Sequence, residues 1–573
     1  MPAKDGGRDP ALDEGAGIVD PTRIITGELT TDAPESFGDE TTKSFGVAGW
    51  TLVSRVTGLM RVVVAGAILG PTFFANIFQA TNTIPNLTYN LMAGSLLTTL
   101  IVPVLVAEFE KSGIEATRKL LRQIVGVICV GFVVAATAVV IVSPIIVHLL
   151  TIGVHGPIQS AHAHKEAWIL LFLVLPQIGL YCLVAAAVAA QNARGHFALA
   201  AAAPEIENIG LMATLVFVAA YFGRDTRNVS TAYLVCLGLG ATGAVVMHCA
   251  VQCYGAARAG LPLWPSFRWT HPAVRALAKR AVPAIGTASL DASWLFILVV
   301  AAGTVPGGVV AVQVGINFYN MPVALSARAV GTVLLPRLSR EAFMEKLGAF
   351  RETYDLGISW SWFVAVPASL TLLVSAKPIA QSIAFGEMRK SDGIALLSAS
   401  IAGLGLALIG ATMFEFAKQA CYARHDVIAP LIGCAAMVAV LLIGAPIAVH
   451  AFTGPRVLLS LGICATLGEL CRALISDRAA RRGTHHQGTS LATNLFRHVT
   501  IALITIVPAA VLGRVIQHAL NGHAHIGAII GVTIGVGAGL AGYLVLQGLF
   551  SAPELPPRLR LDSRRAPAVE GAA

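Results

Sequence analysis

The chain has 573 residues, of which 55% are hydrophobic and only 12% are charged, and its mean hydropathy is +0.73. Soluble domains carry about 25% charged residues, so the composition excludes an ordinary soluble protein. The formal net charge is +9, but the basic residues are scattered between apolar segments, which argues against a nucleic-acid-binding surface.

The first 44 residues are rich in Gly, Asp, Glu, Thr and Pro, and they lack the apolar stretch of a cleavable signal peptide. A segment with so few apolar residues does not bury a core, so we expect residues 1–44 to be a disordered cytoplasmic tail. Residues 551–573 have the same character with added arginines, and they predict a second disordered cytoplasmic tail.

Between the tails, apolar runs long enough to cross a bilayer follow one another with short connections. We place them at about 45–69, 74–107, 123–150, 166–193, 198–222, 229–255, 273–302, 308–336, 352–376, 393–416, 427–451, 457–478, 490–514 and 525–550. The sequence therefore predicts an all-α polytopic membrane protein with about fourteen transmembrane helices. The connections carry no Walker loop, nucleophile elbow or catalytic carboxylate pair, so we expect no enzymatic activity, cofactor or metal.

The Lys and Arg residues in the connections alternate between the two sides of the membrane. Connections after even-numbered helices hold 20 of them, and connections after odd-numbered helices hold 8. Because cytoplasmic loops carry the excess of positive charge, we expect both termini to be cytoplasmic.

An internal repeat links two distant segments. Thr99–Glu108 (TLIVPVLVAE) and Thr332–Glu341 (TVLLPRLSRE) share Thr, Pro, Leu and Glu at the same positions, and each follows a cluster of Asn and Pro. Each copy ends the second helix of a six-helix unit. The repeat predicts two parallel lobes, at residues 45–256 and 257–485, with an added helix pair at 486–550. Two such lobes are typical of alternating-access transporters.

Two arginines lie inside the first predicted span. Arg55 and Arg61 are about 15 and 24 Å along this helix at 1.5 Å per residue. Arginine at the centre of a spanning helix costs about 2.5–3.5 kcal/mol, so we expect these side chains to face a hydrated cavity. Their spacing sets them about 120° apart, and Gly58 between them is a candidate for a bend that brings them together.

Two further charges lie near the middle of predicted spans: Asp291 in the seventh and Arg328 in the eighth. Intramembrane ionisable residues are functional candidates, and a structural Arg328–Asp291 ion pair is the alternative. The remaining intramembrane charges are expected to be interfacial (Glu205 and Glu207) or paired locally on one helix (Glu415 with Lys418, and Glu469 with Arg472).

The segments SRVTGLMR, GAILGPTFFANIFQATNTIPNLTYNLMAGSLLTTLIVPVL and GTVLLPRLSRE resemble the MurJ/MviN family of the multidrug/oligosaccharidyl-lipid/polysaccharide exporter superfamily. The resemblance covers roughly residues 45–550. It implies a flippase for the lipid-linked peptidoglycan precursor lipid II in the bacterial plasma membrane, with a final helix pair that forms a groove for the lipid tail.

The resemblance also assigns residues. Arg55 and Arg61 match the arginines of the family's first-helix motif, which are expected to meet the pyrophosphate. The chain departs from the family where Thr88 to Asn90 and Asn317 stand in place of basic residues, and where Asn76 replaces an acidic residue. The cavity is therefore expected to be less cationic than the family pattern. The expected substrate-binding residues are Arg55, Arg61, Arg328, Asn86 and Asn317.

Two alternatives remain open. The first is a cation-coupled exporter of small amphipathic compounds, for which Asp291 is the ion-coupling candidate. The second is a non-transporting scaffold that recruits cell-wall synthesis proteins. The expected partners are therefore a lipid-linked oligosaccharide, membrane lipids and, for a scaffold, cell-wall synthesis proteins, with no nucleic acid.

Overall fold

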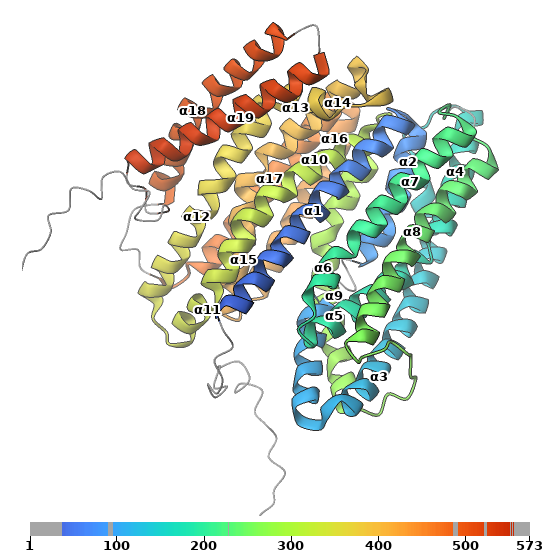
Figure 1. The fold of residues 1–573 in the computed structure, drawn as a ribbon. Coiled ribbons are helices and arrows are strands. Elements are labelled where there is room, and N and C mark those ends of the chain that lie inside the picture. Colours follow the sequence, from blue (N-terminus) through green and yellow to red (C-terminus); the bar gives the residue numbers. More distant parts are fainter. Residues whose placement is uncertain are drawn as a thin grey trace, which may run out of the picture.

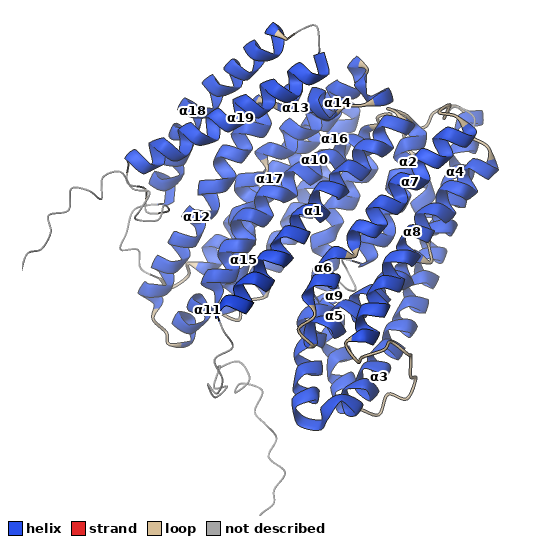
Figure 2. Cartoon of the chain, in the orientation of Figure 1, coloured by secondary structure: helices blue, strands red, loops and turns tan. Residues whose placement is uncertain are grey.

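The computed structural model describes residues 37–89, 96–226, 229–484, 491–520 and 524–550, together with Ala552 and Glu554. These residues form helices and connections, without a β-strand among them (Figure 1 and Figure 2). Of the predicted N-terminal tail, residues 1–36 lie outside the described residues, whereas residues 37–44 form the start of the first helix.

The helices follow one another along the chain, and they include one π-helical turn (η2) and one 3₁₀ turn (η3). They are α1 (Phe37–Leu69), α2 (Phe73–Tyr89), α3 (Leu96–Thr151), α4 (Pro157–Val174), α5 (Gln177–Ala193), α6 (Phe197–Ala202), α7 (Pro204–Phe222), α8 (Thr231–Arg258), α9 (Pro272–Ala302), α10 (Gly308–Val323), η2 (Ala324–Arg328), α11 (Ala329–Phe343), α12 (Leu347–Val374), α13 (Ala376–Ile383), η3 (Gly386–Arg389), α14 (Ser391–Leu406), α15 (Leu408–Ala423), α16 (Ile428–Ala451), α17 (Pro455–Ala480), α18 (Leu491–Ala519) and α19 (Ala524–Leu549).

Ten helical stretches of the described chain are long and apolar enough to cross a membrane, or eleven if the bent pair α14–α15 is one span. The predicted all-helical membrane fold is confirmed, whereas the count of fourteen is not. The other three predicted spans fall on α1, α2 and α9. Of these, α2 has only 17 residues, and Ala288–Ala302 is a shorter apolar helical stretch within the described part of α9.

Two of the longer predicted spans are not single helices. The run 74–107 is divided between α2 and α3, and the run 308–336 is interrupted by η2 just after Pro322. Proline removes a helical hydrogen bond and clashes with the preceding turn, and π-helical turns often mark functional sites. The two copies of the sequence repeat follow these interruptions, in α3 and α11.

The helices form two bundles, with α1–α8 in the first and α9–α17 in the second (Figure 1). The pair α18–α19 packs on α12 and α13, at the side of the second bundle. The predicted boundaries of the lobes stay a prediction. The connection after α8 and the start of α9 pack on α3 of the first bundle through Leu261 and Val274.

The bundles meet at one end, here called the outer end after the predicted orientation, where the α1–α2 and α9–α10 turns lie. The amide of Asn76 in α2 donates to the carbonyl oxygens of Gly303 (3.2 Å) and Val305 (2.7 Å) and accepts from the amide of Val309 (3.0 Å). The side chain of Asn76 is 1% exposed. At the opposite, inner end, α3 and α11 lie apart (Figure 1).

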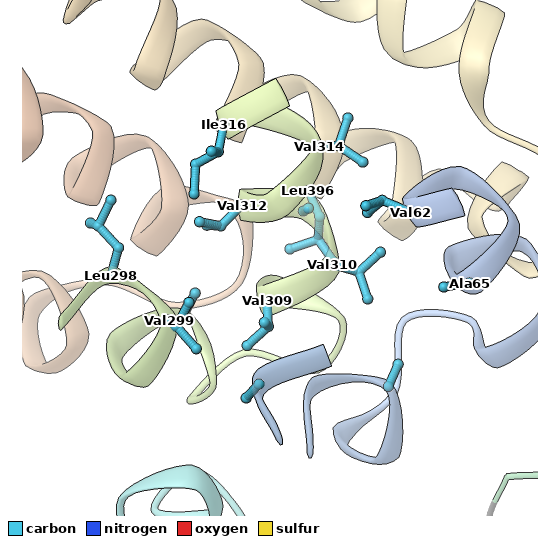
Figure 3. Close-up of a cluster of buried hydrophobic side chains, with 14 of the residues drawn as sticks. Val62, Ala65, Leu298, Val299, Val309, Val310, Val312, Val314, Ile316 and Leu396 are labelled. Atoms are coloured by element: carbon cyan, nitrogen blue, oxygen red, sulfur yellow. The ribbon is translucent and has the colours of Figure 1, made fainter. Parts of the chain in front are cut away.

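At the outer end, backbone atoms of the two bundles also lie in direct contact. At Gly153 a β-carbon would lie 2.5 Å from the Cα of Thr304, and at Gly307, where φ is +76°, it would lie 2.4 Å from the Cα of Pro71. Both positions therefore exclude any larger residue. Behind them, Val62 and Ala65 of α1 belong to one buried cluster with α9, α10 and α14 (Figure 3).

Beyond α19 the chain contacts the protein through the buried residue Ala552 and through Glu554, whose side chain is 1% exposed. Its carboxylate accepts hydrogen bonds from Ser359 of α12 and from Arg497 of α18. Burial raises the pKa of Glu554, but hydrogen bonds from His498 and Ser359, with the charge of Arg497, outweigh it and lower the pKa to about 2. The contact therefore loses its charge only as the pH falls toward that value. The rest of the predicted tail, apart from Ala552, lies outside the described residues.

Replacing Asn76 with alanine is expected to loosen the outer end, because two carbonyls and one amide lose their buried partner at about 1–3 kcal/mol per group. The measurement is the labelling rate of Val309→Cys, in a background without the native cysteines, by a membrane-impermeant maleimide. Val309 is fully buried, so faster labelling reports opening.

The matched control is Asn82→Ala in the same helix, because the Asn82 amide donates only to Phe78 of its own helix. Labelling that stays equally slow in Asn76→Ala and Asn82→Ala would show that Asn76 does not hold the two bundles together.

Candidate functional site

A polar cavity of about 210 Å³ lies where the first bundle faces α9 and α10. Most of its wall comes from α1, α2, α5, α7 and α8, with Leu295 and Gln313 contributed by the second bundle. Its polar side chains are Arg61, Gln79, Asn82, Thr83, Asn86, Gln177, Tyr181, Glu207 and Gln313. A ring of amides and hydroxyls around one guanidinium suits a strongly hydrated or anionic group.

One face of α2 supplies four of these side chains. Gln79, Asn82, Thr83 and Asn86 are spaced at i, i+3, i+4 and i+7, which places them on one side of a helix. Thr83 accepts a hydrogen bond from Gln313 of α10 (2.9 Å), so this face also links the bundles. The spacing is visible in the sequence, although the prediction selected only Asn86 from it.

Arg61 meets a carboxylate in the cavity wall. Its Nη1 lies 3.4 Å from Oε1 of Glu207, which also accepts a hydrogen bond from the Tyr181 hydroxyl (2.7 Å). The second oxygen of Glu207 lies 3.0 Å from Nδ1 of His248. Arg61 therefore lines a polar cavity and has a counter-charge in its wall.

The sequence assigned Glu205 and Glu207 to the membrane interface. The structure places Glu207 in the cavity wall instead, 9% exposed, at the start of α7 where side chains of α1, α5 and α8 surround it. Glu205 is 6% exposed, and both of its carboxylate oxygens lack a hydrogen-bond partner among the described residues.

Arg55 lies in a different place from Arg61. It does not line the polar cavity, it forms no hydrogen bond or ion pair with a described residue, and it lies close enough to Arg328 for their like charges to repel. Because α1 is one continuous helix through Gly58, the two arginines stay on different faces. The expected convergence through a bend at Gly58 does not occur in this structure.

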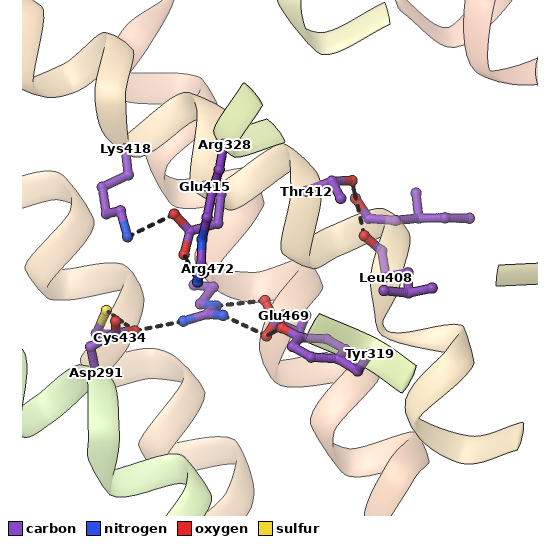
Figure 4. A network of polar contacts seen from close by, with 11 residues as sticks. Asp291, Tyr319, Arg328, Leu408, Thr412, Glu415, Lys418, Cys434, Glu469 and Arg472 are labelled. Carbon is purple, nitrogen blue, oxygen red and sulfur yellow. Dashed lines mark hydrogen bonds and ion pairs between the residues drawn. The ribbon is translucent and has the colours of Figure 1, made fainter. Parts of the chain in front are cut away.

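The second bundle holds a separate network of charges (Figure 4). Arg472 of α17 donates two hydrogen bonds to Glu469 (2.6 and 2.5 Å) and one to Asp291 of α9 (2.9 Å). Tyr319 of α10 also donates to Glu469 (2.6 Å). Arg472 and Glu469 are 4% and 1% exposed, whereas the Asp291 side chain is 44% exposed. Asp291 is thus the partly exposed partner of an otherwise buried Arg472–Glu469 ion pair.

Arg328 joins this network from η2. It lies 3.9 Å from Glu415 of α15, which pairs more closely with Lys418 at 3.0 Å. The alternative Arg328–Asp291 ion pair is absent although both residues are described, while the expected local pairs Glu415–Lys418 and Glu469–Arg472 are both present. Three acidic and three basic side chains balance in this network, so it needs no added ion to neutralise it.

The predicted site residues are therefore not assembled in one place. Arg61 and Asn86 share the polar cavity, while Arg328 and Asp291 belong to the second-bundle network. Asn317 lies one turn beyond Gln313 on α10 and donates to its carbonyl (2.8 Å). Within the described parts of the chain, no group of three or more His, Cys, Asp or Glu side chains converges as a metal site.

Comparison of the sequence with known proteins points to one family. The family model described as lipid II flippase MurJ matches residues 65–529. A probable lipid II flippase MurJ of Haemophilus influenzae is 28% identical over 404 residues, covering 68% of this chain and 77% of the relative. A lipid II flippase MurJ of Burkholderia cenocepacia is 25% identical over 390 residues, covering 67% and 73%.

Two solved structures resemble the fold. A lipid II flippase MurJ in an inward closed conformation superposes with a TM-score of 0.67 at 18% identity, over 87% of this chain and 98% of that chain. An inward-facing multidrug-resistance transporter of the MATE family superposes with a TM-score of 0.56 at 12% identity, over 74% and 94%. Because the family model spans most of the described helices, this chain belongs to the MurJ family.

Proposed function

We propose that the protein is a flippase for a lipid-linked peptidoglycan precursor, lipid II or a related polyprenyl-pyrophosphate glycolipid. It moves the headgroup from the inner to the outer leaflet of the bacterial plasma membrane by alternating access, and both chain termini are cytoplasmic. The observation that carries the proposal is the guanidinium of Arg61 in a polar cavity bounded by both bundles of a MurJ-family chain.

The headgroup chemistry fits this site. Arginine never deprotonates in proteins, and its planar fork donates two parallel hydrogen bonds to phosphate oxygens. Arg61 offers the fork, and the amides and hydroxyls of α2 offer donors and acceptors for sugar hydroxyls. Arg55 and Arg328 supply further positive charge between the bundles. Asn86 and Asn317 lie on α2 and α10, two helices that line the polar cavity.

The arrangement of the bundles supports alternating access. Asn76 and the glycine contacts hold the outer end together, while the inner ends of α3 and α11 diverge (Figure 1). Transport then requires the outer contacts to break and the inner ends to approach. With the inside negative, an anionic headgroup that moves outward gains about 2.3 kcal/mol per charge per 100 mV.

A cation-coupled exporter is the second candidate, because Asp291 is partly open and the fold is shared with a MATE-family transporter. In this structure Arg472 already neutralises Asp291 at 2.9 Å. A coupling cation would have to displace a guanidinium that also holds Glu469, which disfavours this candidate.

Replacing Arg61 with alanine is expected to lower the affinity for a polyprenyl pyrophosphate by about 10- to 100-fold, since charged hydrogen bonds contribute about 1.5–3 kcal/mol. Arg55→Ala is expected to act in the same direction. The measurements are binding to the purified protein and flipping in reconstituted vesicles. Arg337→Ala is the control, because Arg337 is exposed on α11 and pairs with Glu341 of the same helix. Equal flipping by all three variants would exclude arginine recognition of the headgroup.

Replacing Asp291 with asparagine separates the two candidates. A flippase is expected to keep its transport activity, because Arg472 retains both hydrogen bonds to Glu469. A cation-coupled exporter would lose it. Glu469→Gln is the comparison: it removes the buried carboxylate that accepts two hydrogen bonds from Arg472 and leaves only the partly exposed Asp291 as a counter-charge. It is expected to destabilise the protein by up to about 3–5 kcal/mol, seen as a lower melting temperature in detergent.

A further inference from the structure

The cavity contains a contact that the proposed function does not use. The carboxylate of Glu207 pairs with the guanidinium of Arg61, which a bound phosphate would also need. Both side chains line the same cavity, and Glu207 comes from α7 while Arg61 comes from α1. An anionic headgroup that binds Arg61 therefore competes with a carboxylate already present.

The Arg61 contact is the longest of those made by Glu207. The nitrogen–oxygen distance is 3.4 Å, against 2.7 Å for the Tyr181 hydroxyl and 3.0 Å for His248. A guanidinium has five N–H donors, and Arg61 makes no other hydrogen bond with a described residue. Its remaining donors are free to turn toward a ligand, and the Arg61 side chain is 26% exposed.

Glu207 remains satisfied when Arg61 leaves it. Tyr181 still donates to one oxygen, and His248 still faces the other. Removing one partner from a buried ion pair normally strands the other charge at high cost, but these two neighbours reduce that cost here. The arrangement lets Arg61 exchange one anion for another.

We infer that Glu207 is a positioning residue that serves as an internal placeholder for the headgroup phosphate. In the empty cavity it compensates Arg61; when the pyrophosphate enters, Arg61 turns to the phosphate and Glu207 is held by Tyr181 and His248. On release the carboxylate recaptures Arg61. This inference rests on the proposed headgroup role of Arg61, and it explains how a cationic site releases its anion.

The test is the affinity of the purified full chain in detergent for farnesyl pyrophosphate, with inorganic pyrophosphate as the headgroup-only probe. Glu207→Gln removes the competing charge, so both probes are expected to bind at least about tenfold more tightly, equivalent to about 1.4 kcal/mol. Flipping in reconstituted vesicles is expected to slow, because release becomes harder. Tyr181→Phe removes one fallback partner and is expected to weaken binding.

The placeholder role predicts tighter binding in Glu207→Gln and weaker binding in Tyr181→Phe. A purely structural role of Glu207 would instead weaken binding in both variants. Glu205→Gln is the matched control: it is a buried carboxylate two residues away on α7, outside the cavity wall, and is expected to leave the affinity unchanged. Glu207→Asp keeps the negative charge, so its affinity for both probes is expected to match that of the wild type rather than that of Glu207→Gln.

Two outcomes would overturn the inference and leave the proposed function standing. The first is an unchanged affinity in Glu207→Gln while Arg61→Ala loses binding. The second is a weaker affinity in Glu207→Gln. If Arg61→Ala and Arg55→Ala also bind as the wild type does, the proposed headgroup recognition fails as well, and the placeholder fails with it.

Discussion

A charge placed inside a membrane protein must find a counter-charge, a hydrogen-bonding partner or water, and this constraint decides how the two bundles are built. Each bundle meets it differently. The second bundle pairs three acids with three bases in a network where Arg472 and Glu469 are almost completely buried. The first bundle leaves Arg61 in a cavity with one long contact to Glu207. The tight network suits a rigid frame, and the loose pair suits a site where ligands come and go.

The outer end meets the same constraint with backbone groups. The Asn76 amide satisfies two carbonyls and one amide at the α9–α10 turn, and glycines allow the chains to approach until no side chain fits. A neutral amide does this at less desolvation cost than a charged residue. It also separates without leaving a bare charge, because every freed group regains hydrogen bonds when water enters.

The sequence was sufficient for the fold class, and it singled out as site candidates the residues whose cost in a membrane is large. Arg55, Arg61, Asp291 and Arg328 stand out because charges are rare in apolar runs. The helix boundaries were harder, since the apolar residues on both sides of the polar segment NTIPNLTYN made the run 74–107 look continuous, whereas α2 ends at Tyr89 within that segment. Glu207 was misplaced because its interior position depends on how α1, α5 and α8 pack around the start of α7. The partners of Asp291 and Arg328 depend on how distant helices pack, which one sequence does not specify.

The buried carboxylate of Glu554 makes the end of the last helix part of the folded protein. A fluorescent or affinity fusion joined directly to α19 would remove the anion that meets Arg497 and Ser359, whereas one joined several residues farther along would keep it. Reporter fusions used to map membrane topology at this terminus should therefore retain residue 554.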